Sequence, residues 1–373
     1  MNVSTIAVLG LGEAGFQMHM PALAQMAGIK TVGACDLDAE RRANAAKTWG
    51  VPIFDNLDKM LAEARPDVLI VATPPDSHVQ ICLQAIAAGC HLICEKPFTS
   101  TLDEADAVIA AADAAGRRIA LNHEFREMPI FRAVLDEIGG LKGDQIVFAQ
   151  LWQHMDMAPW MEKGWRGRMQ RRTLHEGGVH LVDYVLALFG EKPHAVSATM
   201  SACGAQAAGA DVGADAVAIV SFEFSRGRLA QILQHRLCKG ETQYFELRAD
   251  TRTASYRASF GGRARVSAGL YRSTVPHMRI DYGVSGLAWR EVGNKRTMLA
   301  RNPKEPRVVS TRHVLERSLA AFASGGQPPA SALDGRDALE VINACYEAAE
   351  AGHRVTLAAY PGAEKTTVPA SPS

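Results

Sequence analysis

Three glycines near the N-terminus have the spacing of a phosphate-binding turn. Gly10, Gly12 and Gly15 follow the apolar run at residues 6–9 in the pattern G-x-G-x-x-G. The first glycine permits a tight turn, the second lets the backbone approach a pyrophosphate, and the third allows a helix to pack closely on a strand. Amides at the helix N-terminus would bind the phosphates. The expected loop contacts of a dinucleotide are Gly10, Gly12, Glu13, Ala14 and Gly15.

The next apolar run, at residues 31–35, ends at an acidic residue, Asp36, about 20 residues beyond the glycines. A carboxylate there can accept hydrogen bonds from the ribose hydroxyls of NAD and would repel the additional phosphate of NADP. Arg41 and Arg42 follow closely and leave tolerance of NADP open. We therefore expect NAD as the cofactor.

Further polar residues follow the later apolar runs. In an open α/β sheet, ligands bind beyond the carboxyl ends of the strands. Lys96 follows the run at residues 91–94, and its ammonium could stabilise the alkoxide that develops as hydride leaves a substrate hydroxyl. A lysine in a loop is also often only solvated. The other expected cofactor contacts, together with Lys96, are Thr73, Pro74, Pro75, His78, Glu95 and Asn122.

Short apolar runs alternate with helix-like segments over the first 122 residues. Continuous apolar runs are typical of strands that are buried on both faces, and strand-helix alternation indicates parallel βαβ units. We therefore predict an α/β domain with a Rossmann-type, doubly wound parallel sheet. The runs lie at residues 6–9, 31–35, 68–72, 91–94 and 119–121, and the helix-like segments at 13–27, 38–48, 76–88 and 101–115.

Beyond residue 145 the pattern changes to that of a second, α+β domain. Strand-like runs follow one another without a helix after each, which predicts a large, mostly antiparallel open sheet. Residues 240–310 give no reliable assignment, and residues 333–352 predict one helix. We expect an NAD(P)-binding domain at 1–122, a substrate-binding and oligomerisation domain at 123–360, and a flexible tail at 361–373. Because an open sheet needs covering, a homodimer or homotetramer is expected.

Charge and cysteine usage argue against several other classes of protein. Lys plus Arg number 40 and Asp plus Glu number 40, so no net charge attracts nucleic acid or an anionic membrane. The seven cysteines include no Cys-x-x-Cys pair, which argues against a disulfide framework or a zinc site. We see neither a secretory leader nor an apolar stretch of the roughly 20 residues that a membrane span needs, and we expect a cytoplasmic protein.

Several segments together resemble one family. The glycine turn, A-T-P-P-D-S-H at residues 72–78 and A-G-C-H-L-I-C-E-K-P at residues 88–97 resemble the Gfo/Idh/MocA oxidoreductases, which include glucose-fructose oxidoreductase and inositol dehydrogenase. The segment E-G-G-V-H-L-V-D at residues 176–183 extends the likeness, and the stretch from 320–326 through 334–339 is similar to the family's returning C-terminal helix. The resemblance implies an NAD(P)-dependent dehydrogenase that acts on a secondary hydroxyl of a sugar, cyclitol or related polyol.

The resemblance also implies roles for individual residues. Lys96 would polarise the hydroxyl while His180 takes its proton, a role that suits an imidazole because it titrates near neutral pH. Pro97 is expected to follow a cis peptide. Glu176 stands where the family most often has Asp, so its reach differs. The expected catalytic residues are Lys96, His180 and Glu176, and the expected substrate contacts are Lys96, His123, Arg126, Trp165, Glu176 and His180.

Alternatives stay open at this stage. Asp183 could orient the imidazole of His180 or simply begin a helix, and Trp165 could stack on a sugar or pack between domains. His175 and His180 lack the i, i+4 spacing of a helical zinc motif, so we expect no metal. The same parts would also serve a closed redox cycle on tightly bound NAD, for glycoside cleavage or hydride transfer between sugars. A non-catalytic NAD-binding redox sensor is a further alternative.

Overall fold

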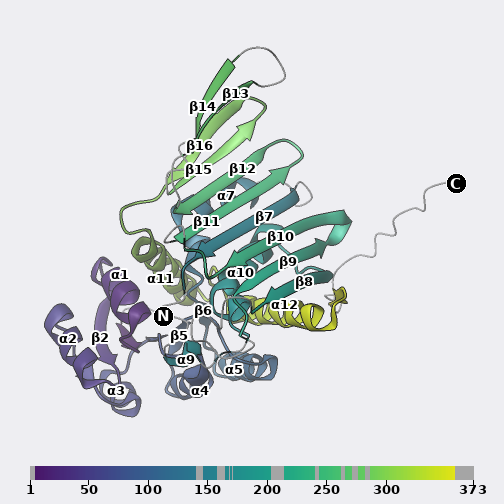
Figure 1. Cartoon of the computed structure of the whole chain (residues 1–373). Coiled ribbons are helices and arrows are strands. Elements are labelled where there is room, and N and C mark those ends of the chain that lie inside the picture. The colour runs from purple at the N-terminus through teal and green to yellow at the C-terminus, as the bar shows by residue number, and fades with distance from the viewer. Residues whose placement is uncertain are drawn as a thin grey trace. The chain divides into compact units, whose positions relative to one another are not determined.

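Two compact units make up the chain in the computed structural model, and each unit combines segments far apart in the sequence (Figure 1). The first comprises the chain up to Ala133 with His175–Asp183 and Ala300–Glu340; the second comprises Val134–Leu174, Tyr184–Leu299 and the chain from Val341. The expected domain boundaries stay predictions, and the expected tail lies outside the described residues. The structure describes residues 5–139, 146–157, 164–167, 169, 171–202, 214–239, 243–261, 265–270, 276–281 and 286–357.

A six-stranded parallel sheet forms the centre of the first unit, in the order β3-β2-β1-β4-β5-β6. The order runs outward in both directions from β1 and β4, so the sheet is doubly wound, as predicted. Its strands are β1 (Thr5–Leu9), β2 (Lys30–Cys35), β3 (Ile53–Phe54), β4 (Val68–Val71), β5 (His91–Cys94) and β6 (Ile119–Leu121). The accompanying helices are α1 (Met20–Ala24), α2 (Ala39–Trp49), α3 (Leu57–Ala64), α4 (His78–Ala87), α5 (Leu102–Ala114), α6 (Glu124–Glu127) and α11 (Pro306–Ser324), with a π-helical turn η1 (Gly15–His19) and a 3-10 turn η2 (Pro75–Ser77).

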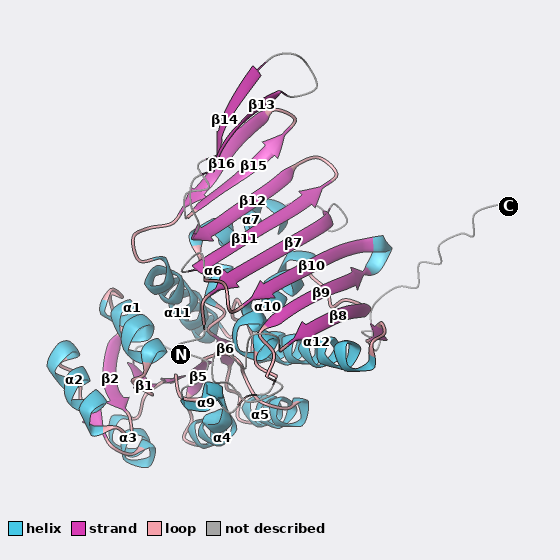
Figure 2. Cartoon of the chain, in the orientation of Figure 1, coloured by secondary structure: helices cyan, strands magenta, loops and turns pink. Residues whose placement is uncertain are grey.

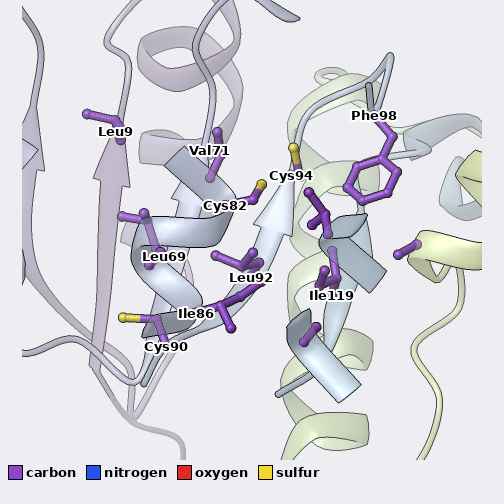
Figure 3. Packing of buried hydrophobic residues seen from close by; sticks show 14 of the residues in the cluster. Leu9, Leu69, Val71, Cys82, Ile86, Cys90, Leu92, Cys94, Phe98 and Ile119 are labelled. Carbon is purple, nitrogen blue, oxygen red and sulfur yellow. The ribbon is translucent and has the colours of Figure 1, made fainter. Parts of the chain in front are cut away.

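Helices bury both faces of this sheet, which explains why its strands are continuously apolar. On one face, Leu69 and Leu92 pack with Ile86 of α4, and Ile119 of β6 belongs to the same cluster (Figure 3). On the other face, alternate residues such as Ile6 and Ile70 form a second cluster. Burial of both faces fixes the strand ends from which the candidate site residues project.

The chain returns to the first unit after residue 300. Helix α11 places Leu315 and Phe322 in the second cluster, and the Phe322 ring stacks on His91 with centroids 4.9 Å apart. The Leu121 amide donates to the carbonyl of Ala330 at 2.9 Å, so the returning segment also contacts the end of β6. The nucleotide-binding fold is therefore completed by residues near the C-terminus.

The second unit contains a nine-stranded sheet in the order β16-β15-β12-β11-β7-β10-β9-β8-β17 (Figure 2). β7 and β10 are parallel neighbours, whereas β11 is antiparallel to both β7 and β12. The sheet is thus mostly antiparallel, as predicted. Its strands are β7 (Ile146–Met155), β8 (Ala195–Ser201), β9 (Val217–Phe224), β10 (Arg228–His235), β11 (Gln243–Thr251), β12 (Ser255–Gly261), β15 (Leu287–Val292), β16 (Lys295–Arg301) and β17 (Val355–Thr356). Strands β13 (Arg265–Leu270) and β14 (Pro276–Asp281) form a separate pair, and the remaining helical elements are α7 (Pro129–Gly139), α9 (Gly164–Gly167), η3 (Thr173–Gly178), α10 (Val179–Phe189), η5 (Ser225–Gly227) and α12 (Ala332–Ala351).

Side chains on β7 and β10 alternate between the two faces of the nine-stranded sheet. Leu151 and Ile232 are paired across the strands and fully buried, whereas Trp152 and Leu233, paired next to them, are only partly buried. This period of two is typical of a sheet with one covered and one open face.

Some elements differ from the sequence predictions. The helix expected at 13–27 is a π-helical turn followed by α1, which ends at Ala24. Residues 240–310, which gave no assignment, contain strands β11 to β16 in their described parts. The helix expected at 333–352 is confirmed as α12.

Candidate active site

The glycine turn connects β1 to η1 and has the shape that a dinucleotide requires. Gly10 has φ of +93°, and a Cβ there would lie 2.5 Å from the carbonyl oxygen of Ala72. A Cβ on Gly15 would lie 1.8 Å from the carbonyl oxygen of Gly10, so this position needs glycine for packing. At Gly12 a Cβ would meet only the tip of the Arg41 side chain, at 3.7 Å. Gly12 therefore leaves its backbone accessible to a phosphate. The residues of the turn fit the pyrophosphate of a dinucleotide.

Asp36 lies beside this turn at the end of β2. Its Oδ2 accepts a hydrogen bond from the Leu11 amide at 2.7 Å and its Oδ1 accepts one from the Asp38 amide at 2.9 Å. The Arg41 guanidinium lies 3.6 Å from Oδ2 on a half-exposed side chain. The carboxylate of Asp36 is thus held in place next to the loop. The cation beside it is Arg41, one of the two arginines for which the sequence left tolerance of NADP open.

His78 ties together the two loops that follow β4 and β5. The ring is fully buried, with Nε2 2.9 Å from the carbonyl oxygen of Thr73 and Nδ1 3.1 Å from that of Pro97. The peptide between Lys96 and Pro97 is cis, as expected. His78 therefore supports the backbone of these loops, and its predicted contact with the cofactor stays a prediction.

A buried carboxylate, Glu95, lies directly before Lys96. Its Oε1 is 2.8 Å from His19 Nε2 and accepts a hydrogen bond from Asn122 Nδ2 at 2.7 Å. Burial alone would raise the pKa of Glu95, but His19 and the Lys96 ammonium lower it to about 2. This ionised group joins η1, β5 and the end of β6 beneath the site. His19 was missed by sequence reasoning because nothing in its surroundings marks a π-helical turn.

Lys96 and the segment that carries His180 lie together within the first unit. Lys96 Nζ donates a hydrogen bond to the backbone carbonyl of Glu176 at 3.0 Å, so this contact does not use the Glu176 carboxylate. His180 is buried, and Phe125 packs edge-on against its ring with centroids 4.7 Å apart. Burial first, and then the charge of Lys96, hold the pKa of His180 well below its ordinary value of 6.5. The imidazole is therefore neutral at neutral pH and able to accept a proton.

Glu124, which the sequence analysis did not select, faces the imidazole. Its Oε2 lies 3.6 Å from His180 Nδ1, and its Oε1 lies 3.8 Å from a guanidinium nitrogen of Arg307. Burial raises the pKa of the Glu124 carboxyl, and Arg307 opposes that effect. Within the described residues, neither Glu124 Oε2 nor His180 Nδ1 has a hydrogen-bond partner. The only available signal was the position of Glu124 directly after the expected site residue His123.

Arg126 and Asp183 form a buried ion pair next to the site. Arg126 donates to both carboxylate oxygens of Asp183, at 2.7 and 2.6 Å, and to Asp334 at 3.1 Å. Burial opposes the charge of Arg126, but the two carboxylates raise its pKa. His123 Nε2 lies 3.6 Å from the same Asp183. Asp183 thus pairs with Arg126 from within α10, which begins at Val179, so it does not begin that helix. Its predicted effect on the orientation of the His180 imidazole stays a prediction.

Trp165 lies on α9 in the second unit, where the Arg166 guanidinium stacks 4.5 Å from the centroid of its ring. Its predicted contact with substrate stays a prediction. The first unit brings together all the other predicted site residues, since Lys96, His123, Arg126, Glu176 and His180 belong to it along with the glycine turn and Asp36.

Comparison with known proteins identifies the family of the chain. Residues 4–123 match the model of the oxidoreductase family with an NAD-binding Rossmann fold, and residues 136–255 match the Gfo/Idh/MocA C-terminal domain. The chain belongs to the Gfo/Idh/MocA oxidoreductase family. It is accordingly an NAD(P)-dependent oxidoreductase that acts on CH–OH groups, and the predicted NAD-binding Rossmann fold is confirmed.

One curated relative and two solved structures resemble the chain over most of its length, and a second relative resembles about half of it. It is 25% identical over 351 residues to D-apiose dehydrogenase of Paraburkholderia graminis, covering 91% of this chain and 86% of that protein. An oxidoreductase from Agrobacterium radiobacter, solved in complex with NAD+, L-tartaric acid and magnesium, superimposes with a TM-score of 0.76 at 18% identity and covers 95% of this chain and 98% of its own. Myo-inositol 2-dehydrogenase of Lactobacillus plantarum gives a TM-score of 0.73 at 18% identity, with 95% and 99% covered. Glucose-6-phosphate 3-dehydrogenase of Bacillus subtilis matches over about half its length, 53%.

The helices within the described ranges include none that is both long and apolar enough to cross a membrane.

Proposed function

We propose that this Gfo/Idh/MocA oxidoreductase catalyses reversible, NAD-dependent oxidation of a secondary hydroxyl on a sugar, cyclitol or related polyol. The observation that carries the proposal is the placement of Lys96 and a neutral His180 in the unit that bears the dinucleotide turn. The activity of D-apiose dehydrogenase, a relative that acts on a sugar, supports the same substrate class.

In this proposal a bound nicotinamide would supply the hydride acceptor, and side chains of the protein transfer the proton. The Lys96 ammonium, oriented by the carbonyl of Glu176, donates a hydrogen bond to the substrate oxygen and stabilises the alkoxide. His180 takes the hydroxyl proton, which a neutral imidazole can do without first losing one of its own. As positive charge develops on the ring, the Glu124 carboxylate at 3.6 Å stabilises it.

Asp36 favours NAD over NADP in this proposal. The carboxylate is nearly buried and is fixed by two backbone amides, so it cannot turn away from an added phosphate. Arg41, at 3.6 Å, offsets part of its charge, and a measurable residual affinity for NADP is expected.

The test is absorbance at 340 nm with purified protein, NAD and a panel of sugars, cyclitols and glycosides. We expect NADH to accumulate with at least one polyol, and NADPH to accumulate much more slowly when NADP replaces NAD. If mass spectrometry detects a product but no net NADH forms, the enzyme follows a closed redox cycle on bound NAD instead of releasing NADH. Binding of NAD without turnover of any substrate would contradict the proposal.

A further inference from the structure

A cluster of metal-binding side chains lies in the second unit, outside the site described above. His154 is the penultimate residue of β7, His235 is the last residue of β10, and Cys238 follows three positions later. One ligand atom from each residue lies within 4.8 Å of those of the other two. All three side chains are partly buried.

Strand register and main-chain bonds bring these residues together. His154 and His235 are direct partners in the parallel pairing of β7 with β10, so both side chains lie on the same face of the sheet. Their rings meet edge-on with centroids 6.2 Å apart. The Cys238 amide donates to the carbonyl of Met155 at 3.0 Å, which anchors the turn that carries the thiol beside β7. The placement is therefore set by the backbone.

We propose that His154, His235 and Cys238 bind a zinc ion, with water as the fourth ligand. Zinc takes nitrogen at about 2.0–2.1 Å and sulfur at about 2.3 Å in a tetrahedron, which places ligand atoms roughly 3.3–3.8 Å apart. The three ligand atoms lie within 4.8 Å of one another, so binding of the ion would draw the side chains closer together. Imidazole and thiolate ligands select zinc over magnesium or calcium, which prefer oxygen.

The charges around the cluster are compatible with a cation. The adjacent lysine, Lys239, carries a charge that a carboxylate offsets, because its ammonium lies 2.9 Å from both carboxylate oxygens of Asp156. Because the three side chains are only partly buried, an ion can reach them from solvent. The bound ion would link the ends of β7 and β10. This metal site is separate from the proposed oxidoreductase activity.

The sequence did not reveal this site because its ligands come from separate strands. His235 and Cys238 alone have the H-x-x-C spacing of half a zinc site, and the third ligand, His154, lies on a strand far earlier in the chain. Only the parallel pairing of β7 with β10 unites them. The expectation of no metal rested on the absence of a Cys-x-x-Cys pair and of a helical zinc motif.

The experiment measures metal binding directly, so its result is independent of turnover. The full-length protein is stripped with a chelator and titrated with zinc in the presence of a chromophoric competitor, and separately with cobalt(II). We expect one equivalent per chain, and for cobalt a thiolate-to-metal charge-transfer band with the visible bands of a tetrahedral site. Loss of a residue that only orients a metal ligand already costs about 10–100-fold in affinity, so His235→Ala should weaken zinc binding by at least about tenfold.

Matched variants make the test specific. Cys238→Ser should abolish the cobalt charge-transfer band, whereas His353→Ala, at an exposed histidine outside the cluster, should leave zinc and cobalt binding unchanged. Zinc should raise the melting temperature of the wild type but not that of Cys238→Ser, since only a folded-state ligand stabilises by mass action. Absence of stoichiometric binding, or equal binding by the wild type and a folded His235→Ala or Cys238→Ser variant, would overturn the proposal.

Discussion

At the scale of single residues, the central feature is a histidine kept neutral by its surroundings. Burial and the Lys96 ammonium both disfavour the charged form of His180 and lower its pKa from 6.5. The residue therefore remains a competent base below the pH at which a free imidazole becomes protonated. We expect the acidic limb of the kcat/KM profile for alcohol oxidation to lie below pH 6.5.

Removal of the Lys96 charge should raise the pKa of His180. In Lys96→Met the second cause of the depressed pKa is gone, so the His180 pKa should rise toward 6.5, as measured by NMR of labelled histidines. Lys59→Met, an exposed lysine paired with Asp55, is the matched control and should leave it unchanged. Equal His180 pKa values in the wild type and Lys96→Met would refute this electrostatic account.

The residue types and spacing predicted part of the site. Asp36 and Lys96 were selected because each follows an apolar run at a strand end, and their roles stay predictions. The cis peptide before Pro97 followed from the family resemblance. Glu124 and His19 were not found, since a single Glu or His has no spacing that marks it. Their importance arises from burial against His180 and Glu95, which only the fold creates.

At the scale of elements, two glycines of the turn are needed for different reasons. Gly15 must lack a side chain so that the turn can pack, whereas Gly12 must lack one so that a phosphate can approach its backbone. Gly15→Ala would place a Cβ 1.8 Å from the Gly10 carbonyl oxygen and should destabilise the fold by more than about 1 kcal/mol. Gly12→Ala meets only a flexible side-chain tip, so the melting temperature should stay near that of the wild type. NAD affinity of Gly12→Ala should nevertheless fall by about tenfold or more, as measured by calorimetry. Unchanged NAD affinity in Gly12→Ala would contradict the proposal that a phosphate of NAD approaches the backbone at Gly12.

Strands that carry a run of apolar residues were predictable, whereas strands with largely exposed side chains were not. β4 reads V-L-I-V and is wholly buried, so its apolar run is unambiguous. β16 reads K-R-T-M-L-A-R and is largely exposed, which leaves no apolar run to detect. Of the strands between 240 and 310, β11, β12, β15 and β16 belong to the nine-stranded open sheet, where pairing with neighbours as well as burial defines the element.

At the scale of the whole molecule, the C-terminal segment that returns to the first unit has a structural role. Leu315 of α11 is fully buried in the cluster that includes Ile6 and Ile70. Leu315→Ala should lower the free energy of unfolding by about 2–5 kcal/mol in denaturant titration. Leu333→Ala, at a side chain that is 49% exposed, should change it by no more than about 0.5 kcal/mol. Similar losses in both variants would argue against this packing.

The return of the chain was implied by the family resemblance of residues 320–339 and not by local patterns. The doubly wound order and the mostly antiparallel sheet follow from alternation of strands and helices, but the contacts of Arg126 with Asp183 and Asp334 join residues far apart in the sequence. The expected homodimer or homotetramer stays a prediction. Leu229 and Ile219, 47% and 45% exposed, are apolar side chains of the second-unit sheet that such an assembly would cover.

The measurement that tests the central claim most directly is the single-turnover rate of NAD reduction in wild type, Lys96→Met and His180→Gln, with a polyol identified as substrate. NAD affinity is measured separately by calorimetry. We predict that each variant loses about 10²–10⁴-fold in the rate of the chemical step while its NAD affinity changes little, because both residues act on the proton of the substrate. Reduction of NAD at the wild-type rate in either variant would contradict the roles assigned to Lys96 and His180.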